Sequence, residues 1–194
     1  MIKGLGSWVL HQACRQVREW EDEGLAVPPL AINVSGAQLR RHSDFENEVA
    51  EAFARWGIRR HRIELELTET VLMDVSKRQS DAIERLRELG ASIAIDDFGT
   101  GYSSLEYLTV YPVQKLKIAQ ELVSRIATDK RHAVVVRAAV RMAHELGIEC
   151  LAEGVEQAAQ ARLLTEFGCK YAQGYLFSRP KSAMDVACLL PAKA

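Results

Sequence analysis

The sequence lacks the long apolar segment that a membrane protein needs. Its longest apolar stretch, residues 133–140, is interrupted by Arg137, whereas a transmembrane helix takes about 20 consecutive apolar residues. The N-terminal Met1-Ile2-Lys3 leads into glycines instead of an apolar core, so we expect no secretory signal and no membrane segment in this chain. We therefore expect a cytoplasmic protein.

The chain also has little surplus charge and no cysteine motif. Its formal net charge is -1, and no stripe of Lys and Arg with interleaved aromatic residues stands out, which argues against DNA or RNA polymers as partners. The four cysteines are widely spaced and form no Cys-x-x-Cys pair (Cys14, Cys150, Cys169 and Cys188). We expect reduced, partly buried thiols rather than a zinc site or disulfides.

What is present is a globular composition in which two patterns alternate. The 194 residues are 48% hydrophobic and 26% charged, so we expect residues 1–194 to form a single domain. The predicted strands are Leu30–Val34, Arg62–Thr68, Ser92–Ile95, Lys115–Ile118, Glu149–Ala152 and Ala172–Phe177. The predicted helices are Trp8–Glu23, Phe45–Trp56 with Asp44 as N-cap, Lys77–Leu89, His132–Leu146, Gln157–Phe167 and Ala183–Leu190.

This alternation predicts an α/β fold with a parallel sheet. Six successive strands without a phosphate-binding glycine loop favour a TIM-type (β/α) barrel over a flavodoxin-like open sheet, although both folds gather polar residues at the carboxyl ends of their strands. Such residues occur at or near the strand ends here: Asn33, Glu66, Glu69, Asp96, Asp97, Lys117, Glu153, Glu156 and Gln173. We expect a functional site to form among them.

The most informative pair is Asp96-Asp97. It follows the apolar run 93–95, which indicates a buried strand. Two adjacent carboxylates repel each other unless a cation lies between them, and a divalent metal is the usual solution. The pair could also form a turn with a helix cap, but Glu66 and Glu153 on neighbouring strand ends favour the metal.

Several other residues keep a structural alternative when they are considered alone. Asn33 could cap the following helix, and Lys117 could be a structural lysine. Gln173 could simply bond to the backbone at the start of its strand.

Taken together, these segments resemble the EAL domain, the bacterial phosphodiesterase domain that hydrolyses cyclic di-GMP to a linear dinucleotide. The matching runs occur in family order over nearly the whole chain: Ala31–Ser35, Leu65–Thr70, Asp96–Ser104, Lys115–Ile118, Ala152–Glu156 and Gln173–Pro180. The resemblance implies an incomplete barrel of the EAL family, with about six of eight strands present.

The resemblance also implies roles for single residues. Asn33, Glu66, Asp96, Asp97 and Glu153 would hold two Mg²⁺ or Mn²⁺ ions, which would activate a water and clamp the phosphodiester. Lys117 would orient or deprotonate that water, and Glu156 and Gln173 would contact the substrate. Glu69 would anchor the loop that couples metal binding to dimerisation: Phe98, Gly99, Thr100, Gly101, Tyr102, Ser103 and Ser104.

Two departures from the family pattern bear on activity. The Glu-Ala-Leu tripeptide that names the family, whose glutamate is a metal ligand, does not occur in the chain, and by comparison the first two strands of the barrel are absent. The family's lysine strand normally reads Lys-Ile-Asp, but here it reads Lys117-Ile118-Ala119. Losing carboxylates weakens both the metal site and the partner of the lysine.

We therefore expect a cyclic di-GMP phosphodiesterase that is weak or inactive as an isolated chain. The alternative is a degenerate EAL module that binds nucleotide or a regulatory protein domain without catalysis. As a fragment with two open strand edges, the chain would form a homodimer or a segment-swapped oligomer. A Schiff-base enzyme using Lys117 is a more distant alternative, because the neighbouring carboxylates favour a metal site.

Overall fold

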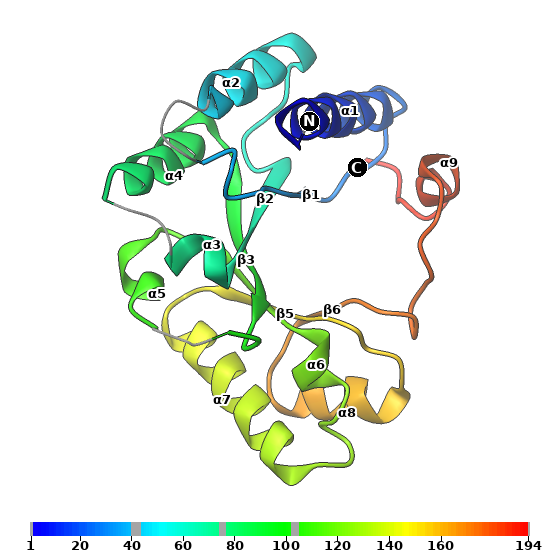
Figure 1. Cartoon of the computed structure of the whole chain (residues 1–194). Helices are drawn as coiled ribbons and strands as arrows, with labels where there is room; N and C mark the ends of the chain where they lie inside the picture. Colours follow the sequence, from blue (N-terminus) through cyan, green and yellow to red (C-terminus); the bar gives the residue numbers. More distant parts are fainter. Residues whose placement is uncertain (1, 40–43, 74–76, 102–104, 194) are drawn as a thin grey trace. The chain divides into compact units, whose positions relative to one another are not determined.

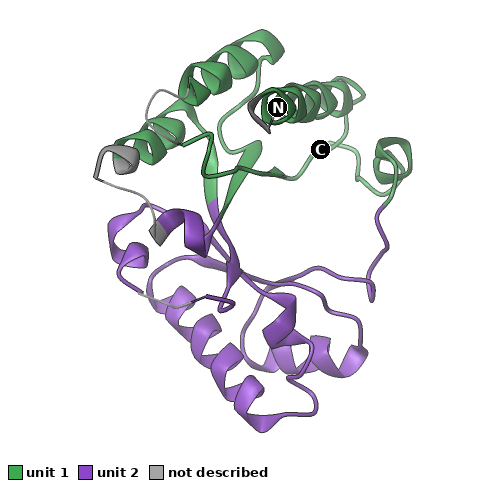
Figure 2. Ribbon diagram, viewed as in Figure 1, with its two compact units in different colours: residues 1–67, 74–93, 181–194 green, residues 68–73, 94–180 purple. Residues whose placement is uncertain are grey.

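The structure, a computed structural model, describes residues 2–39, 44–73, 77–101 and 105–193 (Figure 1). The chain forms two compact units, which Figure 2 colours separately. The first comprises residues 1–67, 74–93 and 181–194, and the second comprises residues 68–73 and 94–180. Among the described residues, no helix is both long enough and apolar enough to cross a membrane.

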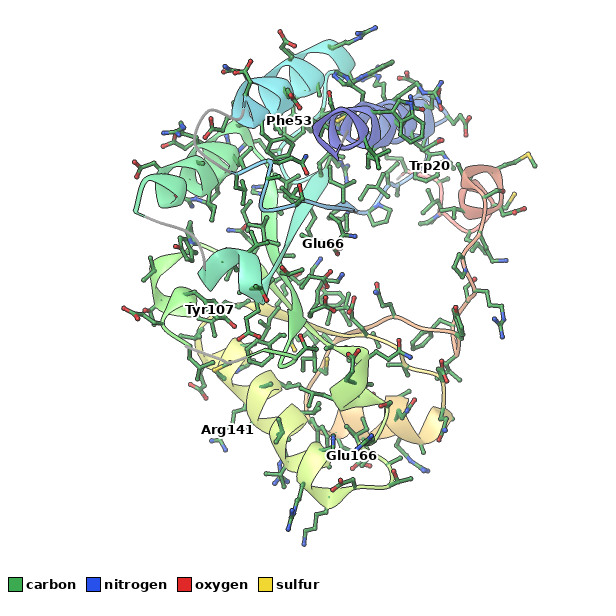
Figure 3. The ribbon with its side chains drawn as sticks, in the orientation of Figure 1. Trp20, Phe53, Glu66, Tyr107, Arg141 and Glu166 are labelled. Carbon is green, nitrogen blue, oxygen red and sulfur yellow. The ribbon has the colours of Figure 1, made fainter. Side chains whose placement is uncertain are left out.

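The first unit packs helices against two parallel strands. Its elements are α1 (Ile2–Asp22), β1 (Leu30–Asn33), α2 (Phe45–Trp56), most of β2 (Ile63–Thr68), α4 (Lys77–Leu89) and α9 (Ala183–Ala187). Strand β1 runs parallel to β2 with Leu30 opposite Ile63. Helix α2 contacts both α1 and α4, and it carries the buried residues Val49 and Phe53 of this core; Figure 3 labels Phe53.

The second unit carries the other strands. Its elements are α3 (Glu69–Met73), most of β3 (Ser92–Phe98), α5 (Tyr107–Val110), β4 (Lys115–Ile118), α6 (Gln120–Val123), α7 (Lys130–Glu145), β5 (Glu149–Ala152), α8 (Ala158–Glu166) and β6 (Tyr171–Ala172). Strands β3, β4, β5 and β6 pair in this order, and all are parallel. Helix α7 covers β4 and β5, while Arg141 on its outer side points away from them (Figure 3). The predicted parallel α/β pattern is therefore confirmed within each unit.

Helix boundaries follow local capping chemistry. Helix α2 has the predicted bounds because Gly57 takes a left-handed φ of 62° and its N–H bonds the last carbonyls. The predicted N-cap was wrong in its mechanism: the Asp44 side chain makes no capping hydrogen bond and accepts from the side chain of Asn47 instead. Helix α1 begins at Ile2, six residues before the predicted start at Trp8.

Two strand predictions were wrong by more than one residue, both at the chemically important end. Strand β3 continues through Asp96 and Asp97 to Phe98, instead of ending at Ile95. The predicted strand Ala172–Phe177 ends at Ala172, so Gln173 follows β6 rather than opening it. There Gly174 has a φ of 152°, and the chain turns so that the Leu176 N–H donates to the Val155 carbonyl at 3.0 Å.

Candidate metal centre and substrate pocket

Lys117 is the centre of the candidate site in the second unit. Its side chain is buried in β4, and its Nζ lies 2.9 Å from Oδ1 of Asp96 and 2.8 Å from Oε1 of Glu153. Asp96 comes from β3 and Glu153 directly follows β5, which are the two strands that pair with β4. One ammonium group is thus held between two carboxylates whose side chains are only 12% and 14% exposed.

A bulge in β3 brings the carboxylate of Asp97 close to those of Asp96 and Glu153. Successive side chains of a regular strand point to opposite faces, which would separate Asp96 from Asp97. The register shifts between Ile95 and Phe98, and Asp97 takes a left-handed φ of 54°, as expected for a bulge that redirects a side chain. As a result, Asp96, Asp97 and Glu153 each offer a carboxylate oxygen within 4.8 Å of the others.

The charge balance of this cluster suits a cation. Three carboxylates face one ammonium group, so the cluster remains anionic. Partial burial raises the pKa of Asp97, and the neighbouring carboxylates of Asp96 and Glu121 raise it further, because burial and nearby negative charge both disfavour the ionised form. An all-oxygen donor set of this kind fits a hard divalent ion such as Mg²⁺ or Mn²⁺.

Two of the predicted ligands, Asn33 and Glu66, belong to the first unit. They are register partners at the carboxyl ends of β1 and β2. Glu66 of β2, which Figure 3 labels, is buried, whereas Asn33 is exposed. Their part in a metal site stays a prediction.

The buried carboxylate of Glu69 lies against the loop after β3. Its Oε2 accepts a hydrogen bond from the Gly99 N–H at 3.2 Å, and the loop begins with Phe98 buried. Thr100 folds back so that its hydroxyl donates to the carbonyl of Asp97 at 3.0 Å. Tyr102, Ser103 and Ser104 lie outside the described residues, and the coupling of this loop to dimerisation stays a prediction.

Glu69 also influences its neighbour Tyr107 on α5, which Figure 3 labels. Burial and then the negative charge of Glu69 raise the pKa of the Tyr107 hydroxyl. Glu69 as a whole is only 2% exposed, so its carboxylate is held beside the loop rather than solvated.

A pocket of about 400 Å³ opens next to the cluster. It is lined by Gln120, Gly154, Glu156, Gln173, Gly174, Tyr175, Ser178, Arg179 and Pro180. The Gln173 side chain joins the pocket to the cluster, because its Nε2 donates to Oε1 of Glu153 at 2.7 Å. The structure therefore places both predicted substrate contacts, Glu156 and Gln173, in one pocket.

Three side chains of this pocket, those of Gln120, Tyr175 and Arg179, had no role in the sequence analysis. The Arg179 guanidinium stacks over the Tyr175 ring at 4.5 Å, and Gln120 at the start of α6 lines the same pocket. Tyr175 and Arg179 lie within the matched run Gln173–Pro180, so the signal was present. The contact between Tyr175 and Arg179 depends on the turn at Gly174, which the sequence analysis did not predict.

Comparison with known proteins gives one consistent family. The EAL domain family matches residues 1–180. The chain is 41% identical over 180 residues to the cyclic di-GMP phosphodiesterase NbdA of Pseudomonas aeruginosa, which covers 93% of this chain and 23% of that protein. Across the curated relatives considered, the chain spans between 22% and 30% of their length.

Solved structures agree. The PaMucR phosphodiesterase in complex with c-di-GMP shares 39% identity and a TM-score of 0.89, over 95% of this chain and 74% of that one. The Klebsiella pneumoniae BlrP1 manganese/cy-diGMP complex shares 31% identity and a TM-score of 0.83, over 92% of this chain and 45% of that one. The likeness confirms the predicted fold class, an incomplete α/β barrel of the TIM type. The chain belongs to the EAL domain family.

Proposed function

We propose that this chain is a phosphodiesterase module that acts on cyclic di-GMP with the help of divalent cations. The observation that carries the proposal is that the Gln173 side chain connects the pocket to the carboxylate cluster. Gln173 lines the pocket and donates to Glu153, which is also a member of the carboxylate cluster. A ligand in the pocket would therefore lie beside the metal-binding oxygens.

Asp96, Asp97 and Glu153 would hold the metal, and the resemblance to the EAL family alone proposes Asn33 and Glu66 as further ligands. Support comes from the oxygen-only cluster and from the relative that was solved with manganese and cyclic di-GMP. When bound, Mg²⁺ or Mn²⁺ would neutralise phosphate charge and make a water more acidic.

Lys117 would position the attacking water. Its ammonium group is held by Asp96 and Glu153, so it donates from a fixed place beside the oxygens that would face the phosphate. A lysine held in this way orients a water by donating to it and stabilises negative charge that develops nearby.

The pocket would bind a guanine base of the substrate. Glu156 offers a carboxylate that can accept from the ring N–H and amino groups of guanine, and Gln173 offers both a donor and an acceptor. The stacked pair of Tyr175 and Arg179 supplies a flat surface against which a base can pack.

We further propose that the isolated chain hydrolyses cyclic di-GMP slowly. Ala119 is fully buried and directly follows the strand of Lys117, and it offers no carboxylate where the family normally has one. The same observation favours a second candidate function: a module that binds cyclic di-GMP or a regulatory protein domain without cleaving it. In either case we propose that it acts as a homodimer or a segment-swapped oligomer.

Calorimetry and turnover measurements with Mn²⁺ separate these functions. Binding of cyclic di-GMP that is weakened by Gln173→Ala, together with slow formation of the linear dinucleotide, supports the first proposal. Binding without any product supports the second. Glu149→Gln is the matched control, because this exposed carboxylate lies at the opposite end of β5 from Glu153.

No binding of cyclic di-GMP would overturn the phosphodiesterase and the nucleotide-binding module, and would leave only the binding of a regulatory protein domain. Rapid turnover that is abolished by Lys117→Ala and Asp96→Ala would instead overturn the proposed impairment.

A further inference from the structure

A second pocket, of about 280 Å³, lies at the amino ends of β5 and β6. Its lining includes Glu149 and Cys150 at the start of β5, Tyr171 at the start of β6, and Gly168 and Lys170 before it. Glu153 and Gln173 follow the other ends of these two strands. The pocket is therefore separate from the metal cluster and the substrate pocket proposed above.

Two buried cysteines lie close together at this pocket, one in its lining and one beside it. Cys150 is 8% exposed and Cys169 is 9% exposed. The Cys169 Sγ lies 3.6 Å from the carbonyl oxygen of Cys150 and 3.3 Å from the carbonyl oxygen of Tyr171. Cys150 lines the pocket itself, and the residues on both sides of Cys169 line it as well.

The fold holds the two cysteines in this arrangement by local backbone structure. After α8, Gly168 takes a left-handed φ of 87°, and the Cys169 N–H donates to the Leu164 carbonyl at 2.9 Å. This is the hydrogen bond of a Schellman motif, which ends the helix and fixes the residue that follows the glycine.

The strand register sets the separation of the two backbones. Leu151 pairs with Tyr171, so Cys150 lies level with Lys170, the residue that follows Cys169. The contact of the Cys169 Sγ with the Cys150 carbonyl oxygen at 3.6 Å shows directly that the two residues are neighbours. Disulfides form at Cα separations of about 4.4–6.8 Å.

The two thiols also differ in pKa. A hydrogen bond from Cys150 lowers the pKa of Cys169; burial of Cys169 opposes this shift, and backbone hydrogen bonds at Tyr171 and Ala152 support it. The same hydrogen bond, together with burial, raises the pKa of Cys150. Cys169 is therefore the better thiolate, and Cys150 is the neighbouring thiol that stays protonated.

We propose that Cys150 and Cys169 form a redox-active dithiol that a small hydroperoxide oxidises to an intramolecular disulfide through this pocket. The Cys169 thiolate attacks the peroxide oxygen, which breaks the O–O bond and gives a sulfenic acid and hydroxide. The sulfur of Cys150 then attacks the sulfenic sulfur, the S–S bond forms, and water leaves. In total, two thiols and one hydrogen peroxide give one disulfide and two waters.

The test uses the full chain with Cys188→Ser, because Cys188 is exposed and would otherwise form intermolecular disulfides. After treatment with hydrogen peroxide, the intact mass should fall by two hydrogens, and a reductant should restore it. Trypsin cleaves after Arg141, Arg162 and Lys170, so the disulfide should join peptide 142–162 to peptide 163–170. The melting temperature should rise by roughly 5 °C on oxidation.

Cys150→Ala and Cys169→Ala, each added to the same background, should abolish both the mass loss and the linked peptide. The chain unfolded in urea controls for folding, because it should lose the preference for this pair over pairs with Cys14. The proposal is overturned if the folded chain keeps all its thiol hydrogens, if the linked peptide contains Cys14, or if Cys169 proceeds to sulfinic acid without a disulfide.

Discussion

The Nζ of Lys117 lies 2.8 Å from Oε1 of Glu153, which is the same oxygen that accepts a hydrogen bond from Gln173 at 2.7 Å. One carboxylate oxygen thus connects the buried lysine, the candidate metal cluster and the pocket. A divalent cation that bound this oxygen would share it with Lys117. Lys117 and a bound metal would therefore both stabilise the negative charge of Glu153, so removing the lysine should change the effect of the metal on stability.

Lys117→Met should destabilise the metal-free protein by about 3 kcal/mol, since it leaves two carboxylates without their buried counter-charge. Mn²⁺ should recover part of this loss, so the thermal shift caused by Mn²⁺ should be larger for the variant than for the wild type. Lys130→Met, at an exposed lysine at the start of α7, is the control and should change neither value. An equal or smaller Mn²⁺ shift in Lys117→Met would contradict the shared-oxygen arrangement.

The sequence alone predicted the elements whose boundaries depend on local chemistry. The bounds of β4, β5 and α2 agree with the prediction because apolar runs and Gly57 define them. It failed at β3, where aspartate disfavours strands but pairing with β4 extends the strand through Asp96 and Asp97. It also failed after β6, where the apolar run 175–177 resembles a strand but Gly174 turns the chain.

The candidate site was predictable in part, where it follows from the alternation of strands and helices. Parallel strands bring their carboxyl ends together, so Asp96, Lys117 and Glu153 could be expected at one edge. That Lys117 bridges the other two carboxylates depends on the register of three strands, which no local pattern encodes. The bulge that turns Asp97 toward Asp96 depends on this register as well.

Gly174→Ala should destabilise the protein by at least about 3 kcal/mol, because a positive φ and a steric clash act together. A Cβ at this position would lie 2.2 Å from the Val155 carbonyl oxygen, at a φ of 152°. Gly147→Ala is the matched control: its φ is 70° but nothing lies within 4 Å, so only about 1 kcal/mol of backbone strain is expected. Urea unfolding measures both variants, and similar losses would show that the turn relaxes around the methyl group.

The buried thiol of Cys14 should make stability fall at alkaline pH. Burial raises the pKa of Cys14 from 9.0 to about 12, so between these values the unfolded chain releases a proton that the folded chain keeps. The contribution of Cys14 is fully present below pH 9 and declines by about 1.4 kcal/mol per pH unit above it. The free energy of unfolding should therefore fall more steeply between pH 9 and pH 11 in the wild type than in Cys14→Ala. Parallel pH profiles would contradict a buried, protonated Cys14.

Ala119→Asp should strengthen the binding of Mn²⁺. Ala119 lies two residues after Lys117, so its side chain lies on the same face of the chain, and its backbone is extended at the start of α6 with a ψ of 146°. Aspartate is well accepted in such a position before a helix, and its charge would add to the cluster of Asp96 and Glu153. We expect about tenfold tighter Mn²⁺ binding by calorimetry, in line with the effect of groups that surround metal ligands.

Ala119→Asn separates charge from size in this experiment, because asparagine has nearly the same shape and the same preference before a helix. It should leave Mn²⁺ affinity close to that of the wild type. If both variants bind Mn²⁺ equally tightly, the gain comes from the start of α6 and not from the added carboxylate. If Ala119→Asp binds no better than the wild type while remaining folded by circular dichroism, residue 119 does not face the metal cluster, and the proposed impairment must have another origin.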